Sequence, residues 1–597
     1  MTVMVKYISC LLFVMFGALY NVNAQDYLIS TPNTSLLLTA KPGEAARIHY
    51  YGTRIEENRI QQIFDSNLAF HSESYPAFGI YSYNDKAMQV THGDGNMSLD
   101  LAVESVKQYT VAEAEITEIL LKDKVYPFFV KQCYKAYKNS DVIGTWVEVT
   151  NQEKKPVTMY KFASAFIPVR RGDNWLTHFH GTWGAENMLQ EERLTDGQKI
   201  IKNEDGVRNT TNENPSFMLT LDGKPQEETG HVFGASLAWS GNYTLKLDVD
   251  NNRIIKIYAG INEDASYYTL DPKKTFVTPE FAMTYSTTGK GGVSRNFHRW
   301  ARMYKLSHAD ADRDILLNSW EGVYFKVDQE VMAQMMKDMS QLGGELFVMD
   351  DGWFGDKYPR DGGSTSLGDW VVCKKKLPQG IEGLIASAKK CGIKFGLWIE
   401  PEMVNSKSEL YEKHPDWIIC QDNRTPTTGR GGTQMILDLS NPKVQDFVFG
   451  VVDNLMTNYP EIAYIKWDAN ASIMNYGSYY LPKDRQSHLY IEYHKGLNNV
   501  LERIRTKYPH LLMQACASGG SRVNYGLLPY FGEFWTSDNT DAYQRIYMQW
   551  GTSYFFPAIA MASHISAAPN HQTFRVIPLK YRIDVAMSGR LGMEIQP

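Results

Sequence analysis

The stretch AYIKWDAN, residues 463–470, begins with apolar residues and ends in a charged segment that contains Lys466, Trp467 and Asp468. Such a run predicts a buried β-strand that passes into a loop. Side chains two residues apart on a strand point the same way, so Lys466 and Asp468 share one face and Trp467 lies on the other. The two charges are therefore either a solvated strand end or part of a site.

Similar apolar runs recur along the chain after residue 314, and helical segments such as 328–343 and 381–392 separate them. Strands that alternate with helices predict a parallel sheet. About eight such units in about 280 residues are typical of a (β/α)8 TIM barrel. The predicted strands are 315–320, 345–351, 394–402, 463–470, 511–519, 533–541, 560–568 and 589–595. The chain stops after the last of them, so we expect the final helix of the barrel to be missing.

The region before the barrel has a different pattern. Short alternating runs, separated by turn signals such as DGN, TDGQ and SGNY, fill residues 25–290 and predict a large antiparallel β-sandwich. A helical segment at 294–306, SRNFHRWARMYKL, lies within the predicted linker 291–313. The chain is therefore predicted to combine an amino-terminal β domain with an α/β barrel at 314–597.

Residues 1–24 contain one Lys, an apolar run and a final Val22-Asn23-Ala24. This is the plan of a secretory signal peptide with cleavage after Ala24. The apolar run is too short to span a bilayer comfortably, so we expect no membrane anchor. A signal peptide without an anchor predicts a periplasmic or secreted location.

The composition narrows the function classes. The formal net charge is −6, and no basic stripe is visible, which argues against a nucleic-acid partner. None of the six Cys residues forms a Cys/His cluster with zinc spacing, so we expect no metal and no cofactor. Aromatic residues make up 13% of the chain, and flat aromatic rings pack well on the apolar faces of sugars.

In a TIM barrel the active site lies at the carboxyl ends of the strands. The predicted strand ends carry acids, aromatics and small residues, in the segments 318–320, 350–353, 398–402, 466–470, 516–520 and 535–541. Paired carboxylates between aromatic walls, without a metal or cofactor motif, indicate glycoside hydrolysis.

Two aspartates fit the two roles that this reaction needs. Lys466 would lower the pKa of Asp468 and keep that carboxyl ionised, which suits a nucleophile. Asp538 follows the apolar residues Phe534 and Trp535, which would raise its pKa and suit a general acid.

Other acidic and thiol groups have alternative interpretations. Asp350 and Asp351 could hold a metal, although no His or third acid lies at ligand spacing. Glu400 and Glu402 could be catalytic, but their place in IEPEM favours a supporting role. Cys516 could be a buried spacer, a redox-sensitive thiol or part of a sugar-lining wall.

Long motifs surround these residues in a fixed order, and with them the sequence resembles the α-galactosidases of glycoside hydrolase family 36. The motifs are VMDDGWFG (348–355), GLWIEPEMV (396–404), GRGGTQMILDLS (429–440), YIKWDAN (464–470), CASGGSRVNYGLLPYF (516–531) and FWTSDNTDAYQRI (534–546). Three amino-terminal motifs extend the resemblance over nearly the whole chain: IHYYGTRI (48–55), FHGTWGAE (179–186) and FVTPEFAMTYS (276–286).

The resemblance implies an amino-terminal β-supersandwich, a TIM barrel and a small carboxy-terminal β domain, the last of which we expect to be missing from this sequence. It also implies a retaining mechanism through a covalent galactosyl-enzyme. Carried over by motif, Asp468 is the nucleophile and Asp538 the general acid/base. The residues expected to bind galactose are Asp350, Asp351, Trp398, Arg430, Lys466, Asn470, Cys516 and Gly519.

The expected partners are therefore α-galactoside oligosaccharides or glycans. An α-N-acetylgalactosaminidase or a galactosyl transferase of the same family, and a non-catalytic sugar-binding relative, are the alternatives. A homo-oligomer is compatible with the resemblance, because tetrameric members bring the region after ESYPAFG (73–79) close to a neighbour's active site. Here that region reads IYSYNDKAMQ, residues 80–89, which departs from the run found in many members.

Overall fold

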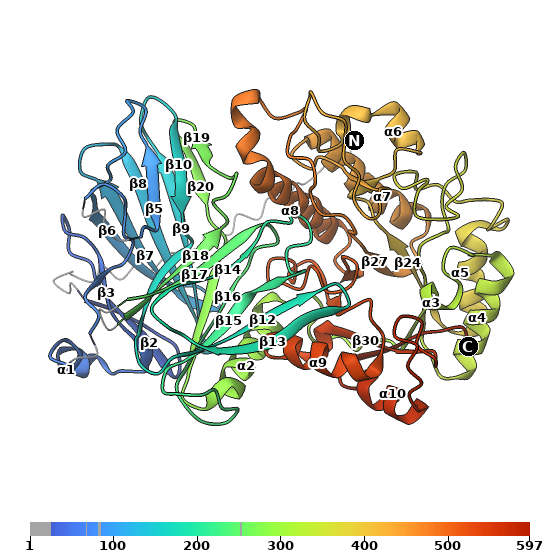
Figure 1. Cartoon of the computed structure of the whole chain (residues 1–597), viewed down its shortest axis with the longest axis horizontal. Helices are drawn as coiled ribbons and strands as arrows, with labels where there is room; N and C mark the ends of the chain where they lie inside the picture. Colours follow the sequence, from blue (N-terminus) through green and yellow to red (C-terminus); the bar gives the residue numbers. More distant parts are fainter. Residues whose placement is uncertain (1–25, 67–68, 81–84, 251–253) are drawn as a thin grey trace, which may run out of the picture.

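The computed structural model describes residues 26–66, 69–80, 85–250 and 254–597. The predicted signal peptide and residues 81–84 of the divergent run lie outside this part of the chain. Figure 1 shows two parts side by side, an amino-terminal region of strands and a carboxy-terminal region in which strands and helices alternate. In the described ranges, no helix combines the length and apolarity needed to cross a membrane.

The largest amino-terminal sheet is antiparallel and has ten strands in the order β13-β12-β15-β16-β21-β9-β8-β7-β6, with β20 paired to β9. Its strands are β6 (Leu101–Thr110), β7 (Ala114–Asp123), β8 (Phe128–Tyr137), β9 (Val142–Asn151), β12 (Trp175–Thr182), β13 (Ala185–Arg193), β15 (Glu213–Thr220), β16 (Val232–Leu237), β20 (Lys274–Val277) and β21 (Phe281–Ser286).

Smaller sheets complete this region. They contain β1 (Asp26–Ser30), β2 (Thr34–Thr39), β3 (Arg47–Thr53) and β4 (Ser72–Glu73); β5 (Met88–Thr91), β10 (Val157–Phe162) and β19 (Tyr268–Leu270); and β11 (Ala165–Arg170), β14 (Gly197–Asn203), β17 (Tyr243–Val249) and β18 (Ile254–Ile261). Alternate residues of β17, from Tyr243 to Val249, are buried, as expected for a strand with one face on a core. The helices here are η1 (Glu57–Arg59) and α1 (Ile60–Phe64). The predicted antiparallel sandwich is confirmed.

The predicted linker segment is a helix, α2 (Gly289–Trp300), followed directly by the π-helical turn η2 (Ala301–Lys305). One side of α2 packs on the large sheet, where Gly234 of β16 leaves room for Val293. Its other side meets the barrel, because the Trp300 and Tyr525 rings have centroids 4.8 Å apart. The helix therefore joins the two parts through a shared core.

Eight parallel strands close into the predicted barrel, and β31 pairs back to β22. They are β22 (Leu316–Asn318), β23 (Leu346–Met349), β24 (Lys394–Ile399), β27 (Ile462–Trp467), β28 (Leu512–Ala515), β29 (Glu533–Trp535), β30 (Met561–Ser566) and β31 (Arg590–Glu594). Every predicted barrel strand overlaps one of these.

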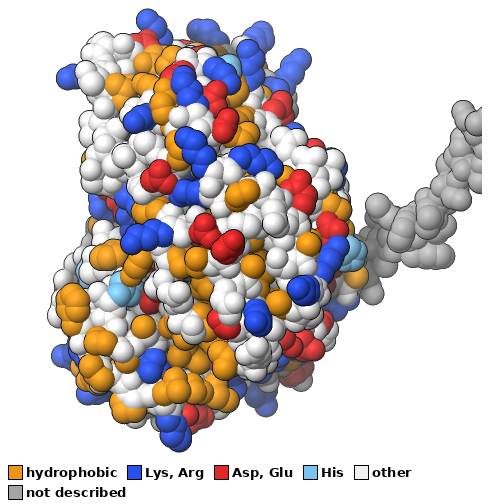
Figure 2. All heavy atoms as spheres, turned by 90° about the vertical axis from the view of Figure 1, so that its right-hand side faces the viewer, with side chains coloured by type: hydrophobic (Ala, Val, Ile, Leu, Met, Phe, Trp, Pro, Cys, Tyr) orange, Lys and Arg blue, Asp and Glu red, His pale blue; other side chains and the backbone are white. Residues whose placement is uncertain are grey.

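Helices surround the barrel, namely α3 (Trp320–Val323), α4 (Gln329–Gln341), α5 (Gly380–Cys391), α6 (Glu409–Lys413), α7 (Pro442–Asn458), α8 (Leu489–Lys507), α9 (Ala542–Ser553) and α10 (Leu579–Ala586). The short elements are β25 (Met403–Val404), β26 (Met435–Ile436), η3 (Pro415–Trp417), η4 (Lys483–His488) and η5 (Ala558–Ala560). α4 shows why they form: Asp328 caps it, and its methionines at 332, 335, 336 and 339 make one buried stripe. Figure 2 shows hydrophobic side chains gathered low on the barrel face, where α10 lies in Figure 1 and Leu579 and Met587 are exposed.

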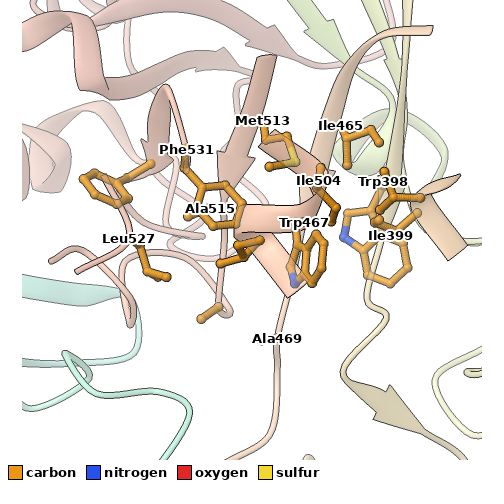
Figure 3. Packing of buried hydrophobic residues seen from close by; sticks show 14 of the residues in the cluster. Trp398, Ile399, Ile465, Trp467, Ala469, Ile504, Met513, Ala515, Leu527 and Phe531 are labelled. Carbon is orange, nitrogen blue, oxygen red and sulfur yellow. The ribbon is translucent and has the colours of Figure 1, made fainter. Parts of the chain in front are cut away.

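The alternation of β27 decides the position of the site. Ile465 and Trp467 are buried against Ile504 of α8, on the outer side of the barrel (Figure 3). Tyr464, on the opposite face, belongs to a cluster inside the barrel with residues of β22 and β23. Lys466 and Asp468 therefore point to the barrel interior, as the two-residue period predicts.

Candidate active site

Lys466 forms its closest ion pair with Asp350, which follows β23. Lys466 Nζ lies 2.8 Å from Asp350 Oδ2, and both side chains are buried. Burial lowers the pKa of Lys466, but nearby negative charges, Asp350 first among them, outweigh that effect, and the pKa lies well above the ordinary value. The predicted effect of Lys466 on Asp468 is confirmed, because the Lys466 charge lowers the pKa of Asp468, and the structure adds the ion pair with Asp350. The lysine stem is long enough to reach past β24 to the carboxylate at the end of β23.

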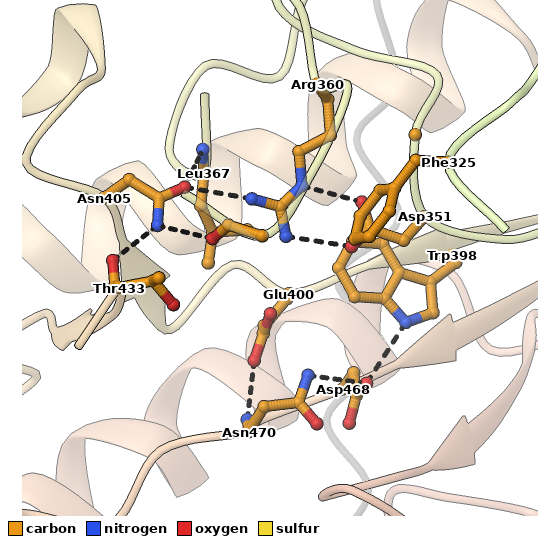
Figure 4. Close-up of polar contacts among 12 residues, drawn as sticks. Phe325, Asp351, Arg360, Leu367, Trp398, Glu400, Asn405, Thr433, Asp468 and Asn470 are labelled. Carbon is orange, nitrogen blue, oxygen red and sulfur yellow. Dashed lines mark hydrogen bonds and ion pairs between the residues drawn. The ribbon is translucent and has the colours of Figure 1, made fainter. Parts of the chain in front are cut away.

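Asp468 is held by several donors at the end of β27. The backbone amides of Ala469 and Ser518 donate to Oδ1 at 2.9 and 3.2 Å. Asn470 Nδ2 and the Trp398 indole donate to Oδ2 at 2.8 and 3.3 Å, and Figure 4 shows both bonds. These bonds favour the ionised carboxylate.

The pKa of Asp468 lies below its ordinary value although burial alone would raise it. The positive charges of Arg430 and Lys466 and the bond from Asn470 outweigh burial, and the Cys516 thiol also donates to this carboxyl. Arg430 makes the larger electrostatic contribution, and Lys466 adds the lowering that the sequence predicts. Asp468 is therefore ionised at neutral pH.

Asp538, beyond β29, has the opposite shift. Burial raises its pKa, and the charge of Asp468 raises it further. Two indoles bind its carboxyl: Trp535 Nε1 lies 3.0 Å from Oδ1, and Trp183 Nε1 lies 3.2 Å from Oδ2. The site therefore holds one carboxyl whose pKa is lowered and one whose pKa is raised.

Gly519 lies against the backbone of this second acid. Its φ is +87°, and a Cβ there would come within 2.5 Å of Asp538 N and 2.8 Å of Glu186 Oε1. A side chain would displace the acid, so the position requires glycine. Cys516 is buried close by, and burial raises the pKa of its thiol well above the ordinary value, so the thiol stays protonated.

Asp351 is bound by a buried arginine on the loop that follows it. Arg360 Nε and Nη2 donate to the two Asp351 oxygens at 2.9 and 2.8 Å (Figure 4). Arg360 Nη1 also donates to Asn405 Oδ1 at 3.0 Å. Because Asp350 and Asp351 each face a cation from the protein, their charge arrangement does not favour the alternative of a metal site.

Arg430 lies at the mouth of the barrel, on the loop between β25 and β26. Its side chain is 38% exposed, and its Nη1 lies 3.9 Å from Glu400 Oε2. The backbone φ of Arg430 is +46°, a left-handed conformation within a turn closed by Gly429 and Gln434. This turn brings a positive charge close to Glu400 and Asp468.

Glu400 and Glu402 are buried next to the site and accept hydrogen bonds from residues around it. Glu400 accepts hydrogen bonds from the backbone N–H of Asn470 and from Gln434 Nε2, and burial together with the Asp468 charge raises its pKa to about 8. Glu402 accepts hydrogen bonds from Trp467, Tyr493 and Arg522. Trp467 therefore has a polar contact as well as its packing.

Sequence patterns assigned no role to Trp183 and Glu186, on and beside the β12–β13 turn of the amino-terminal region. Both residues lie in the motif FHGTWGAE, which was the one available signal. Trp183 and Asp538 are 355 positions apart, and no local periodicity connects them. The structure brings all ten sequence-predicted site residues to the carboxyl end of the barrel, and this turn comes to the same place.

Comparisons with known proteins agree with this geometry. A family model described as Melibiase matches residues 275–597, and one described as the glycosyl hydrolase family 36 N-terminal domain matches residues 44–271. The α-galactosidase AgaA of Geobacillus stearothermophilus is 36% identical over 540 residues, which are 88% of this chain and 73% of AgaA. The α-galactosidase Mel36A of Lactobacillus acidophilus is 33% identical over 597 residues, which are 96% of this chain and 80% of Mel36A.

Solved structures extend the likeness to three dimensions. The crystal structure of AgaA superposes with a TM-score of 0.89 at 33% identity and covers 96% of this chain and 83% of that one. Variants of AgaA in complex with stachyose and with raffinose each superpose with a TM-score of 0.90 and the same coverage.

Proposed function

The chain belongs to glycoside hydrolase family 36, and from that premise we propose that it is a retaining α-galactosidase. It removes terminal non-reducing α-D-galactosyl residues through a covalent galactosyl-enzyme. The observation that carries the proposal is the pair of buried carboxyls with opposite pKa shifts, Asp468 lowered and Asp538 raised. Retaining glycosidases need such a pair.

Each carboxyl has a defined step. Ionised Asp468 attacks the anomeric carbon while protonated Asp538 gives its proton to the departing glycosidic oxygen. Asp538, now ionised, then takes a proton from a water molecule, which attacks the anomeric carbon and releases Asp468. Trp183 and Trp535 hold the Asp538 carboxyl through both steps, because each indole binds a different oxygen.

The galactose pocket is lined by the other predicted residues. Asp350 and Asp351 offer carboxylate oxygens to sugar hydroxyls while Lys466 and Arg360 hold them in place. Trp398 forms a wall and Arg430 lies at the entrance. We propose α-galactoside oligosaccharides as substrates, since variants of the relative AgaA form complexes with stachyose and raffinose. The predicted signal peptide supports a periplasmic or secreted location.

The decisive test compares Asp468→Ala and Asp538→Ala on an aryl α-galactoside with azide. Azide should rescue Asp468→Ala to give β-galactosyl azide, and Asp538→Ala to give α-galactosyl azide. NMR identifies the anomer of each azide. If Asp468→Ala gave the α-azide and Asp538→Ala the β-azide, the roles of the two residues would be exchanged. Asp369→Asn is a matched control, because Asp369 is a buried aspartate that binds backbone amides of α6 away from the site.

The wild-type enzyme provides the test of retention. The first sugar released from an α-galactoside should be α-galactose, before mutarotation. β-Galactose as the first product would refute the retaining mechanism. Parallel assays with N-acetylated galactosides and with sugar acceptors test the two other activities expected within the family.

A further inference from the structure

Glu186, on β13 of the amino-terminal region, is a buried carboxyl beneath the proposed general acid/base. Its side chain is 0% exposed, and its Oε2 accepts a hydrogen bond from Ser537 Oγ, a residue 351 positions along the chain. Its other oxygen, Oε1, has no hydrogen-bond partner within the described residues. Burying a carboxyl with an unpaired oxygen costs free energy of folding, which suggests that Glu186 has a functional role.

The β12–β13 turn contacts three consecutive barrel residues. Glu186 binds Ser537, Trp183 donates to the carboxyl of Asp538, and the backbone oxygen of Gly184 accepts from Asn539 Nδ2 at 2.9 Å. These contacts flank and include the acid itself. The turn therefore sets the position of Asp538 more directly than the barrel strand, which ends at Trp535.

Further contacts transmit the position of Glu186 to the acid. Ser537 Oγ, which donates to Glu186, also accepts from Asn539 N at 3.1 Å. Gly519 lies between Glu186 Oε1 and Asp538 N and leaves no room for a side chain. A shift of Glu186 would therefore move the peptides on both sides of Asp538.

The bond from Ser537 to Glu186 does not depend on the protonation state of Glu186. Burial raises its pKa, the Ser537 bond opposes this, and the charge of Asp538 raises it again, to about 7. Arg545 of α9 is the nearby cation, and its interaction with Glu186 is the leading factor that offsets its own burial. A neutral carboxyl still accepts the Ser537 bond, and a glutamine amide has the same shape and acceptor.

We infer that Glu186 is a positioning residue for proton transfer: through Ser537 it aims Asp538 at the leaving-group oxygen. The inference rests on the proposed role of Asp538 and extends it. It makes the amino-terminal region part of the catalytic apparatus, although Glu186 touches no reacting atom.

The test uses two substrates that differ in how much they need an acid. Methyl α-galactoside has a poor leaving group, which must be protonated as it departs. The 2,4-dinitrophenolate of 2,4-dinitrophenyl α-galactoside leaves without protonation. Misplacing a catalytic group by about 1 Å can cost about 100-fold, so Glu186→Ala should lower kcat/KM about that much for the methyl galactoside. For the dinitrophenyl galactoside it should change kcat/KM less than about fivefold. Glu186→Gln should stay close to wild type on both.

The control separates this inference from the proposed function. Asp538→Ala must show the same dependence on the leaving group; if it does not, the acid role of Asp538 fails first. If Asp538→Ala shows the dependence but Glu186→Ala loses activity equally on both substrates, Glu186 is structural and the inference is overturned. A Glu186→Gln enzyme as impaired as Glu186→Ala would overturn it too. Should Glu186→Ala not fold, Ser537→Ala removes the same bond and must give the same dependence.

Discussion

Asn470→Ala should move the acid limb of the pH profile of kcat/KM to higher pH. Asn470 Nδ2 donates to Asp468 Oδ2 at 2.8 Å, and both residues are buried. A hydrogen bond to a charged group contributes about 1.5–3 kcal/mol, and about 1.4 kcal/mol corresponds to one pKa unit. Because two backbone amides and the Trp398 indole remain, the lower part of this range applies. The pKa of Asp468 should rise by about one unit.

The sign follows from the role of Asp468. The nucleophile works when ionised, so activity is lost as the pH falls through its pKa, and a raised pKa brings that loss to higher pH. The acid limb of kcat/KM should therefore move up by about one pH unit while the alkaline limb stays within about 0.3 unit. Asn475→Ala is the control, because Asn475 lies on the same loop and its side chain binds the backbone of Thr427. An unmoved acid limb, or equal movement of both limbs, would refute the reasoning.

Three further outcomes are expected. Lys466→Met strands the Asp350 carboxylate in the barrel, so urea unfolding should show a loss of about 3–5 kcal/mol, and a loss below about 1 kcal/mol would contradict the buried pair. Met336→Ala removes a fully buried side chain of α4 and should cost about 2–5 kcal/mol in the same assay, with little effect on KM. Trp183→Phe removes a bond that lowers the pKa of Asp538, so the alkaline limb of the kcat/KM profile should move to higher pH by up to about one unit. A move to lower pH would argue against the bond.

Much of the fold could be predicted because its signals are local. The barrel strands are short apolar runs separated by amphipathic helices, and even the poorly marked run at 560–568 contains β30 (Met561–Ser566). The start of the linker helix was harder to predict, because the helix begins at Gly289, before the apolar periodicity becomes clear. Gly289 and Gly292 are poor helix formers, and tertiary packing on the large sheet overrides that preference.

Some features of the site could likewise be predicted from local sequence, and others could not. The side-chain direction of Lys466 and Asp468 follows from the strand period, and the strand-end rule places both at the mouth. The rule does not say which acid the lysine reaches. Lys466 Nζ lies 2.8 Å from Asp350, whereas Arg430, on a separate loop, makes the larger contribution to the low pKa of Asp468. Such partners depend on side-chain length and loop path, which leave no periodic trace.

The sequence by itself determined the barrel, the face of each strand and the two carboxyls, because hydrophobic period and strand ends are properties of neighbouring residues. Only the tertiary structure decided how those carboxyls are held. The chain must fold the β12–β13 turn onto the barrel before Trp183 can bind Asp538 and Glu186 can bind Ser537. These contacts join residues more than 350 positions apart. Their energies depend on burial and distance, which exist only once the two regions have packed together.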